Sequence, residues 1–257
     1  MSKDHGVRLS YDGGLAEIRL NRPNARNALR GTDWLALLDA ARAVAESGAR
    51  AVVIRGDGHN FCSGFDVSEI APGKTDAFAV VDGQVNPALK ALRAIPVPVI
   101  AAVEGACVGG GFGIAAACDI VLCSQNAKLG SPYSAIGIMC DAGLHTFLRD
   151  TLGYQRAAYL IFTGKLLSAE EAQALGLCAE VYPDNMFESA MRAFAEKLAA
   201  GPTCALTMSK RILQHATDDT AGMEMEAVGQ ARVFSSEDAK AGISAFLAKT
   251  RPSFTGR

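Results

Sequence analysis

The sequence lacks the cysteine spacing that disulfide frameworks and zinc sites require. Seven cysteines are spread over 257 residues, and no two of them form a Cys-x-x-Cys pair. An odd, scattered set among apolar neighbours is typical of reduced thiols that pack as small hydrophobic side chains. We therefore expect no disulfide framework, no metal site and a cytoplasmic location.

Two further absences narrow the class of partner. The 25 Lys and Arg residues nearly balance the 27 Asp and Glu residues, so the formal net charge of −2 gives no basic field for nucleic acid or an anionic membrane. No segment reaches the roughly 18 uncharged apolar residues that span a bilayer, and residues 1–6 carry no apolar signal core. We expect a protein that binds neither nucleic acid nor membrane.

The first part of the chain shows strand and helix patterns in alternation. Alternating apolar residues on both sides of Asp12-Gly13-Gly14 predict a β-hairpin over residues 7–20. Thr32 or Asp33 is suited to cap the next helix, which carries a broad apolar face and ends at Gly48. The patterns indicate an α/β protein.

The remaining patterns divide the chain into two regions. Further strands are expected over 51–56, 96–103, 119–123 and 127–130. Helical patterns cover 78–95, with interruptions at Gly83 and Pro87, and then 141–152, 155–163, 168–176, 186–200, 203–216, 219–235 and 236–249. No strand pattern follows Gly201-Pro202. We therefore expect a core with the active site in residues 1–200 and a C-terminal helical region in residues 201–257.

One stretch combines a buried strand with a glycine-rich helix start. An apolar run rich in β-branched residues follows Pro96 and Pro98, and Gly109-Gly110-Gly111 then opens a helix of small residues. Backbone N–H groups without Cβ atoms around them form a site for an anion or a developing oxyanion. Close packing alone would also explain the glycines, and this stretch by itself leaves both interpretations open.

A second stretch completes a recognisable pattern. The 51–56 strand leads into a loop that ends in Phe61-Cys62-Ser63-Gly64-Phe65-Asp66. Some forty residues on, the other strand leads into Glu104-Gly105-Ala106-Cys107-Val108-Gly109-Gly110-Gly111-Phe112-Gly113, with Cys118-Asp119 after it. Together these segments resemble the crotonase, or enoyl-CoA hydratase/isomerase, superfamily. The resemblance runs from Asn21-Arg22-Pro23 to residues 244–249, which is nearly the whole chain.

The resemblance implies a fold and a class of substrate. The fold would be a spiral of ββα units whose C-terminal helices mediate trimerisation, commonly as a dimer of trimers. The substrate would be an acyl-CoA thioester, and no separate cofactor is implied because the substrate carries the CoA. The N–H groups of Phe65 and Gly110 would form an oxyanion hole for the thioester carbonyl, and each such donor contributes about 3–4 kcal/mol to transition-state stabilisation.

The sequence departs from the family's hydratases at the two positions that carry their acid/base glutamates. Gly113 and Tyr133 stand at the matching positions. Addition of water without either carboxylate has no evident proton route. We therefore expect weak or no hydration of 2-enoyl-CoA.

Asp141 is the remaining candidate for proton transfer. Its position matches the catalytic aspartate of 1,2-epoxyphenylacetyl-CoA isomerases and dienoyl-CoA isomerases, and the nucleophile of 4-chlorobenzoyl-CoA dehalogenases. Without that resemblance, Asp141 would be interpreted as the N-cap of the 141–152 helix. His145 lies four residues on and would share a helix face with Asp141, where it could tune the carboxyl group or be an ordinary surface histidine. Tyr133 could reach the substrate with its hydroxyl group or line an apolar acyl pocket.

The resemblance also implies where the CoA binds. The segments involved contain Ala25 or Arg26, then Ser63, Gly64, Phe65 and Asp66, with Gly109 beside the donor. Phe246 and Lys249, from the same or a neighbouring subunit, would contact the adenine and the phosphates. Asp66 also suits a structural role in its loop, and Lys249 also suits the C-terminus of any helix.

Several alternatives remain open at this point. Gly111-x-Gly113-x-x-Ala116 formally matches a dinucleotide-binding motif, but no Asp or Glu lies between Asp119 and Asp141 to hold a ribose. A hydratase with another base, a thioester hydrolase, a dehalogenase and a non-catalytic CoA-binding protein would all fit the fold. The interpretation we favour is an isomerase that shifts a double bond or opens a ring epoxide, with Asp141 as proton carrier. The run from Phe246 to Gly256 also resembles the phenylacetate-pathway isomerases.

Overall fold

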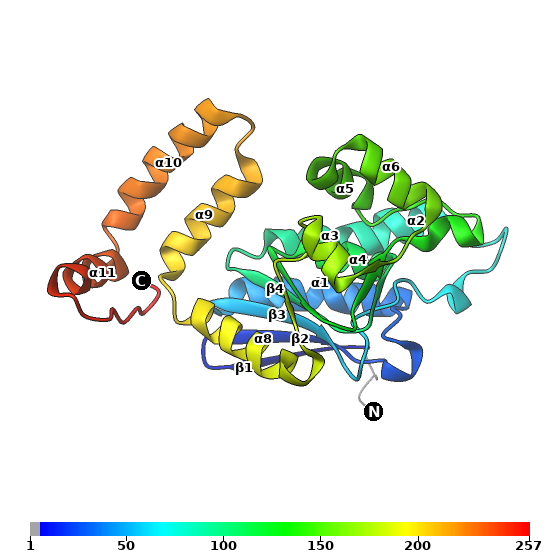
Figure 1. Ribbon diagram of the computed structural model, residues 1–257, viewed down its shortest axis with the longest axis horizontal. Coiled ribbons are helices and arrows are strands. Elements are labelled where there is room, and N and C mark those ends of the chain that lie inside the picture. The colour runs from blue at the N-terminus through cyan, green and yellow to red at the C-terminus, as the bar shows by residue number, and fades with distance from the viewer. Residues whose placement is uncertain (1–5) are drawn as a thin grey trace.

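A six-stranded sheet forms the centre of the computed structural model, which describes residues 6–257 (Figure 1). Its strands, in spatial order, are β1 (Val7–Asp12), β2 (Leu15–Leu20), β3 (Ala51–Gly56), β4 (Val99–Val103), β6 (Ile120–Ser124) and β9 (Glu180–Tyr182). Only the β1–β2 hairpin is antiparallel, as the Asp-Gly turn predicted, and every other neighbouring pair is parallel.

Alternation along the central strands separates two hydrophobic cores. In β3, Val52 and Ile54 belong to the larger core, whereas Ala51 and Val53 belong to the smaller one. The smaller core packs against α8 (Asp184–Ala199), and the larger one against α1 (Gly31–Glu46), α3 (Asn86–Ala94) and α4 (Gly110–Ala117). The sheet is therefore covered on both faces, which suits its parallel strands.

A second, three-stranded sheet was not predicted in full. It contains β5 (Ala106–Val108), β7 (Lys128–Gly130) and β8 (Leu167–Ser168). The prediction of one strand leading directly into the glycine-rich helix was wrong, because the chain turns at Gly105 and adds β5 in a different sheet. Gly105 has a φ of +53°, and its Cα lies close to the carbonyl group of His59, so only glycine fits this turn.

The helices agree with the predicted ranges to within a few residues. The remaining ones are α2 (Ala77–Val80), α5 (Leu144–Leu152), α6 (Tyr154–Thr163), α7 (Ala169–Ala174), α9 (Thr203–His215), α10 (Asp219–Phe234) and α11 (Glu237–Ala248). Short 3-10 turns cover Pro23–Ala25, Val67–Glu69 and Pro132–Ile136. None of the helices within residues 6–257 is long and apolar enough to cross a bilayer.

Two predicted helix starts were wrong. The N-cap of α1 is Arg30 rather than Thr32 or Asp33, and the buried Asp33 carboxylate instead closes the capping box from the third helical position. The helix predicted from Asp141 starts at Leu144, because Ala142 and Gly143 both have positive φ values of 54° and 75°. These two left-handed residues separate Asp141 from α5.

The helical pattern over residues 78–95 is less interrupted than predicted. A π-helical turn, Val81–Val85, joins α2 to α3 at the position of Gly83. Pro87 lies in the first turn of α3, where its missing N–H group has no helical partner to lose. Turns of this π-helical type occur mostly within helices and often near functional sites.

The helices α9, α10 and α11 stand to one side of the sheet (Figure 1). Arg50, just before β3, anchors their start by donating hydrogen bonds to the carbonyl of Gly201 at 2.6 Å and to Thr203 Oγ1 at 2.9 Å. Lys210 of α9 is buried and reaches Asp119 Oδ2 at 2.6 Å, beside β6. A division of the chain after residue 200 stays a prediction.

Candidate active site

The loop after β3 directs one backbone donor away from its neighbours. Leu29 pairs with Phe65 in a parallel bridge, in which Leu29 N donates to Gly64 O at 2.8 Å and Asp66 N donates to Leu29 O at 2.9 Å. Because these two groups face Leu29, the N–H group of Phe65 points to the opposite side. Within residues 6–257 this N–H group has no hydrogen-bond acceptor.

The start of α4 supplies the second donor. Gly110 is the first residue of the helix, and such a residue has no carbonyl partner for its N–H group within the helix. Gly109 before it has a φ of +58° and donates its own N–H group to Gly130 O at 2.9 Å. The Gly110 N–H group is therefore the one left free at this helix start.

Backbone hydrogen bonds join the two donor segments. Cys62 N donates to Ala106 O at 2.9 Å, and Val108 N donates to Cys62 O at 2.9 Å. At Gly64, with a φ of +96°, a Cβ atom would stand 3.0 Å from Gly110 N and 2.9 Å from Val108 O. A residue with a side chain there would separate the segments, so Gly64 is what allows Phe65 and Gly110 to lie side by side.

Tyr133 connects this pair of donors to Asp141. A Cβ atom at Gly109 would lie 3.4 Å from Tyr133 Oη, so the phenol group stands directly over the residue before the second donor. The Tyr133 hydroxyl group donates a short hydrogen bond to Asp141 Oδ1. The structure thus brings Gly110, Tyr133 and Asp141 to one location, although the sequence separates Gly110 from Asp141 by a strand pair and a loop.

The surroundings of Asp141 shift its acidity upward. Burial in a low-dielectric environment raises the pKa of the Asp141 carboxyl group, while the hydrogen bond from Tyr133 and the charge of His145 act against this rise. Burial and the neighbouring carboxylate also raise the pKa of Tyr133 well above its ordinary value, so its hydroxyl group stays protonated and donates. A carboxylate with a raised pKa is a stronger base than a solvated aspartate.

Asp141 is not the helix cap that its position suggested. The N-cap of α5 is Gly143, and the Asp141 side chain makes no capping hydrogen bond. His145 therefore does not share a helix face with it, although the charge of His145 still acts on the carboxyl group. The carboxylate is held by Tyr133 instead, which the sequence placed as either a substrate contact or a pocket wall.

A side chain at Gly113 has no space in this site. A Cβ atom there would overlap the methyl group of Ala142 and stand 2.8 Å from Ala142 O. Ala142 is buried and belongs to the larger hydrophobic core. The backbone next to Asp141 therefore occupies the space that a glutamate at position 113 would need.

The predicted CoA-binding residues near the first donor lie together. Ser63 N donates to Arg26 O at 3.0 Å, and Ser63 Oγ donates to Ala25 O at 3.3 Å. These contacts hold the 3-10 turn that ends at Ala25 against the segment that contains Gly64 and Phe65. No substrate is bound here, so a role in CoA binding stays a prediction.

Asp66 makes contacts that shape its own loop. Its carboxylate accepts hydrogen bonds from Ser68 N and Oγ at 3.2 and 2.6 Å, and from Arg22 Nη1 at 2.8 Å. The Ser68 and Arg22 contacts lower the pKa of the Asp66 carboxyl group. The Asp66 side chain fixes the turn that follows Phe65, and Arg22 ties it to the loop after β2.

Phe246 and Lys249 are not part of this group within one chain. They lie at the end of α11, on the far side of α9 and α10 from α4 (Figure 1). The Phe246 side chain is 82% exposed, and Lys249 ends the helix with a φ of +56°. A contact between these residues and a bound CoA would have to come from a neighbouring subunit.

Sequence reasoning missed two residues that shape the site. A Cβ atom at Gly110 would stand 2.9 Å from the Trp34 ring, so this buried indole supports the start of α4 from α1. Asn27 is also buried, and its amide donates to Asp57 O and Asn60 O at 3.0 and 2.6 Å. The only signals were that Trp34 is the single tryptophan and that Asn27 lies in a polar loop.

Comparisons with known proteins agree with this geometry. The family model for enoyl-CoA hydratase/isomerase matches residues 10–257. A protein of Rhodobacter capsulatus named "Probable enoyl-CoA hydratase" is 37% identical over 255 residues, which cover 98% of this chain and 99% of the relative. The 1,2-epoxyphenylacetyl-CoA isomerase of Escherichia coli is 31% identical over 251 residues, with 95% and 96% of the two chains covered.

Solved structures give the same result. The crystal structure of an enoyl-CoA hydratase from Bacillus anthracis superposes with a TM-score of 0.92 at 28% identity, and covers 98% of this chain and all of the other. The chain therefore belongs to the enoyl-CoA hydratase/isomerase family and has the crotonase fold that its motifs predicted. It is a family enzyme that acts on acyl-CoA substrates.

Proposed function

We propose that this protein is an acyl-CoA isomerase that works through a thioester enolate. The N–H groups of Phe65 and Gly110 polarise the thioester carbonyl, and Asp141 moves the proton. The observation that carries this proposal is the Asp141 carboxyl group, which is held by Tyr133 over Gly109, next to the second donor. The similarity to the isomerase of Escherichia coli supports the same assignment.

The steps follow from the positions of these groups. The ionised Asp141 removes a proton from the α-carbon of a 3-enoyl thioester, and the electron pair of the broken C–H bond moves into an enolate whose oxygen accepts from both N–H groups. The extended enolate then takes the proton back from Asp141 at its γ-carbon. The double bond moves into conjugation, and Asp141 returns to its ionised form.

The Tyr133 hydroxyl group has a supporting role in this proposal. Its hydrogen bond stabilises the ionised form of Asp141, which keeps part of the carboxyl population deprotonated despite burial. It also fixes the direction of one carboxylate oxygen, which leaves Oδ2 to face the substrate. One carboxylate that accepts and returns a proton is sufficient for an allylic shift.

Hydration is the alternative that the site supports less well. Addition of water needs one group to activate the water and another to protonate the α-carbon. The glutamate positions hold Gly113 and Tyr133, and Ala142 fills the space beside Gly113. The name of the Rhodobacter capsulatus relative favours hydration, so this alternative belongs in the test.

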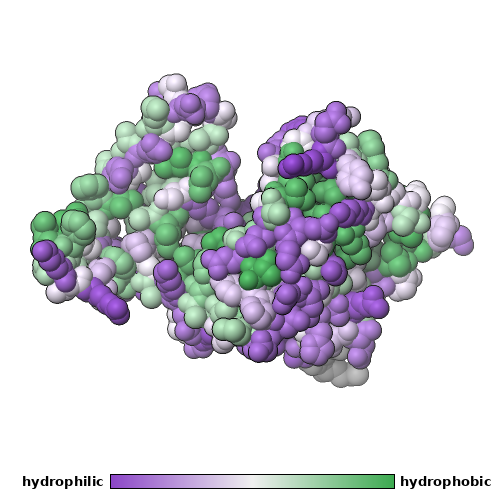
Figure 2. Space-filling model, viewed as in Figure 1, coloured by the Kyte–Doolittle hydropathy of each residue, from purple (hydrophilic) through white to green (hydrophobic). Residues whose placement is uncertain are grey.

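We also propose that the enzyme assembles as a homotrimer or a dimer of trimers. Large apolar side chains of the three C-terminal helices are more than two thirds exposed in one chain, namely Leu213, Val228, Phe246 and Leu247. Figure 2 shows apolar residues gathered over α9 and α10. Exposed apolar surface of this kind is typical of subunit interfaces. Light scattering on the purified protein measures the mass directly, and a monomer at micromolar concentration would contradict this part.

A paired assay tests the proposed reaction. Purified enzyme is given 3-enoyl-CoA and 2-enoyl-CoA, and isomerisation and hydration are followed separately in wild type and Asp141→Asn. We expect isomerisation that the substitution reduces by about 10²–10⁴-fold, with little hydration in either protein. Strong hydration that survives Asp141→Asn would contradict the assignment, because another base would then be required.

A further inference from the structure

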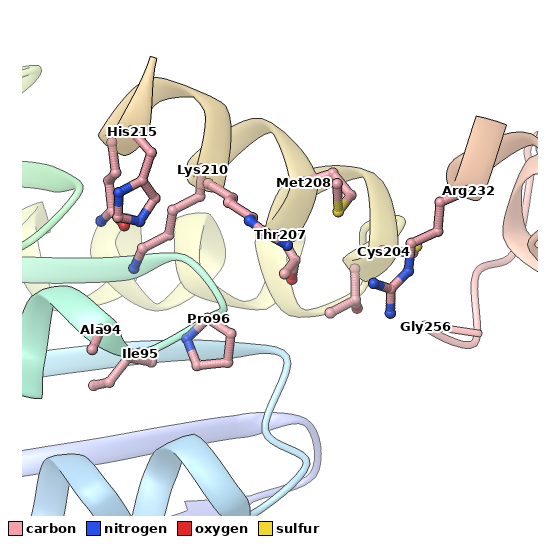
Figure 3. Close-up of a pocket in the computed structure, with 13 residues that line it drawn as sticks. Ala94, Ile95, Pro96, Cys204, Thr207, Met208, Lys210, His215, Arg232 and Gly256 are labelled. Atoms are coloured by element: carbon pink, nitrogen blue, oxygen red, sulfur yellow. The ribbon is translucent and has the colours of Figure 1, made fainter. Parts of the chain in front are cut away.

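A second cavity lies away from the Phe65–Gly110 site, between the body of the protein and the C-terminal helices. Its volume is about 550 Å³, within the range of small-molecule sites. One wall is formed by Ala94, Ile95 and Pro96, between α3 and β4, and the facing wall by α9 (Figure 3). None of the residues that form the candidate active site lines it.

The charged groups of this cavity are basic. Arg211 and His215 come from α9, one turn apart, and Arg232 comes from α10. In Figure 3, His215 and Arg232 lie towards opposite ends of the cavity. No acidic residue lines the cavity. The two guanidinium groups have no hydrogen bond or ion pair within residues 6–257.

The other polar groups of the cavity are already satisfied. Lys210 is neutralised by Asp119, the acidic residue nearest to it, and also donates to Val97 O at 3.0 Å. Gln214 Nε2 donates to Arg93 O at 3.1 Å. These contacts cap carbonyl groups at the end of α3 that would otherwise repel an anion. The positive charge left in the cavity is therefore that of Arg211 and Arg232.

Two unpaired guanidinium groups that share a cavity repel each other, and a bound anion removes this repulsion. Arginine is suited to such a ligand because its planar donors match phosphate and carboxylate oxygens in pairs. The Thr207 hydroxyl group adds a further donor, whereas Ile95, Pro96 and Met208 offer apolar surface. The lining fits a small molecule with anionic groups at both ends and an apolar middle.

We propose that the cavity between α9, α10 and the Ala94–Pro96 segment binds a small polyanion that carries at least two phosphate or carboxylate groups. Such a ligand joins the C-terminal helices to the segment that leads into β4. It stabilises the folded chain in proportion to its occupancy. This site is separate from the proposed function and does not depend on it.

Titration calorimetry and thermal unfolding of the full-length protein test this proposal. The probes are pyrophosphate for the phosphate class and citrate for the carboxylate class, each compared with sodium chloride at matched ionic strength. The variants are Arg211→Gln with Arg232→Gln, alone and combined. Arg149→Gln serves as the control, because it removes an exposed guanidinium group of α5. Asp141→Asn is included to separate this site from the active site.

We expect saturable binding of at least one probe and a rise in unfolding temperature that sodium chloride does not reproduce. The double variant should weaken the Kd by about tenfold or more, which corresponds to about 1.4 kcal/mol, while Arg149→Gln and Asp141→Asn bind as wild type does. Circular dichroism verifies that the double variant is folded. Equal binding by wild type and the double variant, or no saturation up to about 10 mM, would overturn the proposal.

Discussion

Gly113 and Ala142 are in such close contact that one excludes a side chain on the other. A Cβ atom at position 113 would overlap the Ala142 methyl group and stand 2.8 Å from its carbonyl oxygen. Ala142 adopts a positive φ of 54°, which places Asp141 next to Tyr133. The absence of a glutamate at position 113 and the presence of Asp141 in the site are thus two results of one packing arrangement.

This contact predicts that Gly113 cannot be exchanged without cost. Gly113→Ala should lower the free energy of unfolding by about 1–3 kcal/mol because it overpacks the core. Gly113→Glu should lose more stability and should gain no hydratase activity, since the new side chain has no room in the site. Urea unfolding and the 2-enoyl-CoA assay measure the two effects.

The partner variant provides the control. Ala142→Gly removes the methyl group and relieves a positive φ at the same time, so part of the loss in Gly113→Ala should be recovered in the double variant. Fully additive effects would contradict direct contact between the two residues.

The oxyanion hole is tested by removing one donor. Gly110→Pro eliminates the N–H group, and proline is tolerated in the first turn of a helix. Gly110→Ala adds a Cβ atom against Trp34 but keeps the N–H group, so it corrects for the steric effect. We expect kcat/KM for the proline variant to fall about 10²–10³-fold below that of the alanine variant. Similar rates in the two folded variants would exclude Gly110 as a donor.

The pH dependence of turnover should report Asp141. Turnover requires the ionised carboxylate, so the rate falls as the pH drops through the raised pKa of Asp141. Tyr133→Phe removes a hydrogen bond that lowers this pKa. The acidic limb of kcat/KM should therefore move to higher pH. An acidic limb that stays in place or moves to lower pH would contradict the role of the Tyr133 hydroxyl group.

The same raised pKa has a consequence for stability. Because folding raises the pKa of Asp141, the folded chain binds this proton more tightly than the unfolded chain, and stability falls as the pH rises between the two pKa values. The ionised carboxylate therefore costs stability above the folded pKa and not below the unfolded value, near 4. Asp141→Asn removes this cost, so its gain in stability over wild type should grow as the pH rises. Urea unfolding between about pH 4.5 and 7.5 measures this difference, and a gain that shrinks with rising pH would contradict the burial of the charge.

The sequence allowed the fold class and the two donor segments to be predicted, because glycine spacing and strand patterns are local signals. Gly64 and Gly109 mark positions where only a bare backbone fits, and the structure brings these positions together. The family assignment followed from the same residues and is confirmed by the matching family model.

The arrangement around Asp141 could not be predicted from local patterns. A helix start at Asp141 was the natural interpretation, because alanine rarely adopts the left-handed conformation that Ala142 has. The contact between Tyr133 and Asp141, and the support of Gly110 by Trp34, depend on packing between distant segments. The strand β5 was missed for a similar reason, since its partner β7 lies some twenty residues further along the chain.

The most direct test of the account is exchange of the α-proton of a saturated acyl-CoA in deuterium oxide. Butyryl-CoA has no double bond to shift or hydrate, so exchange followed by NMR isolates removal of the proton and stabilisation of the enolate. The account predicts exchange with wild type, loss of exchange with Asp141→Asn, and a strong reduction with Gly110→Pro compared with Gly110→Ala. Exchange that persists at the wild-type rate in Asp141→Asn would contradict Asp141 as the proton carrier.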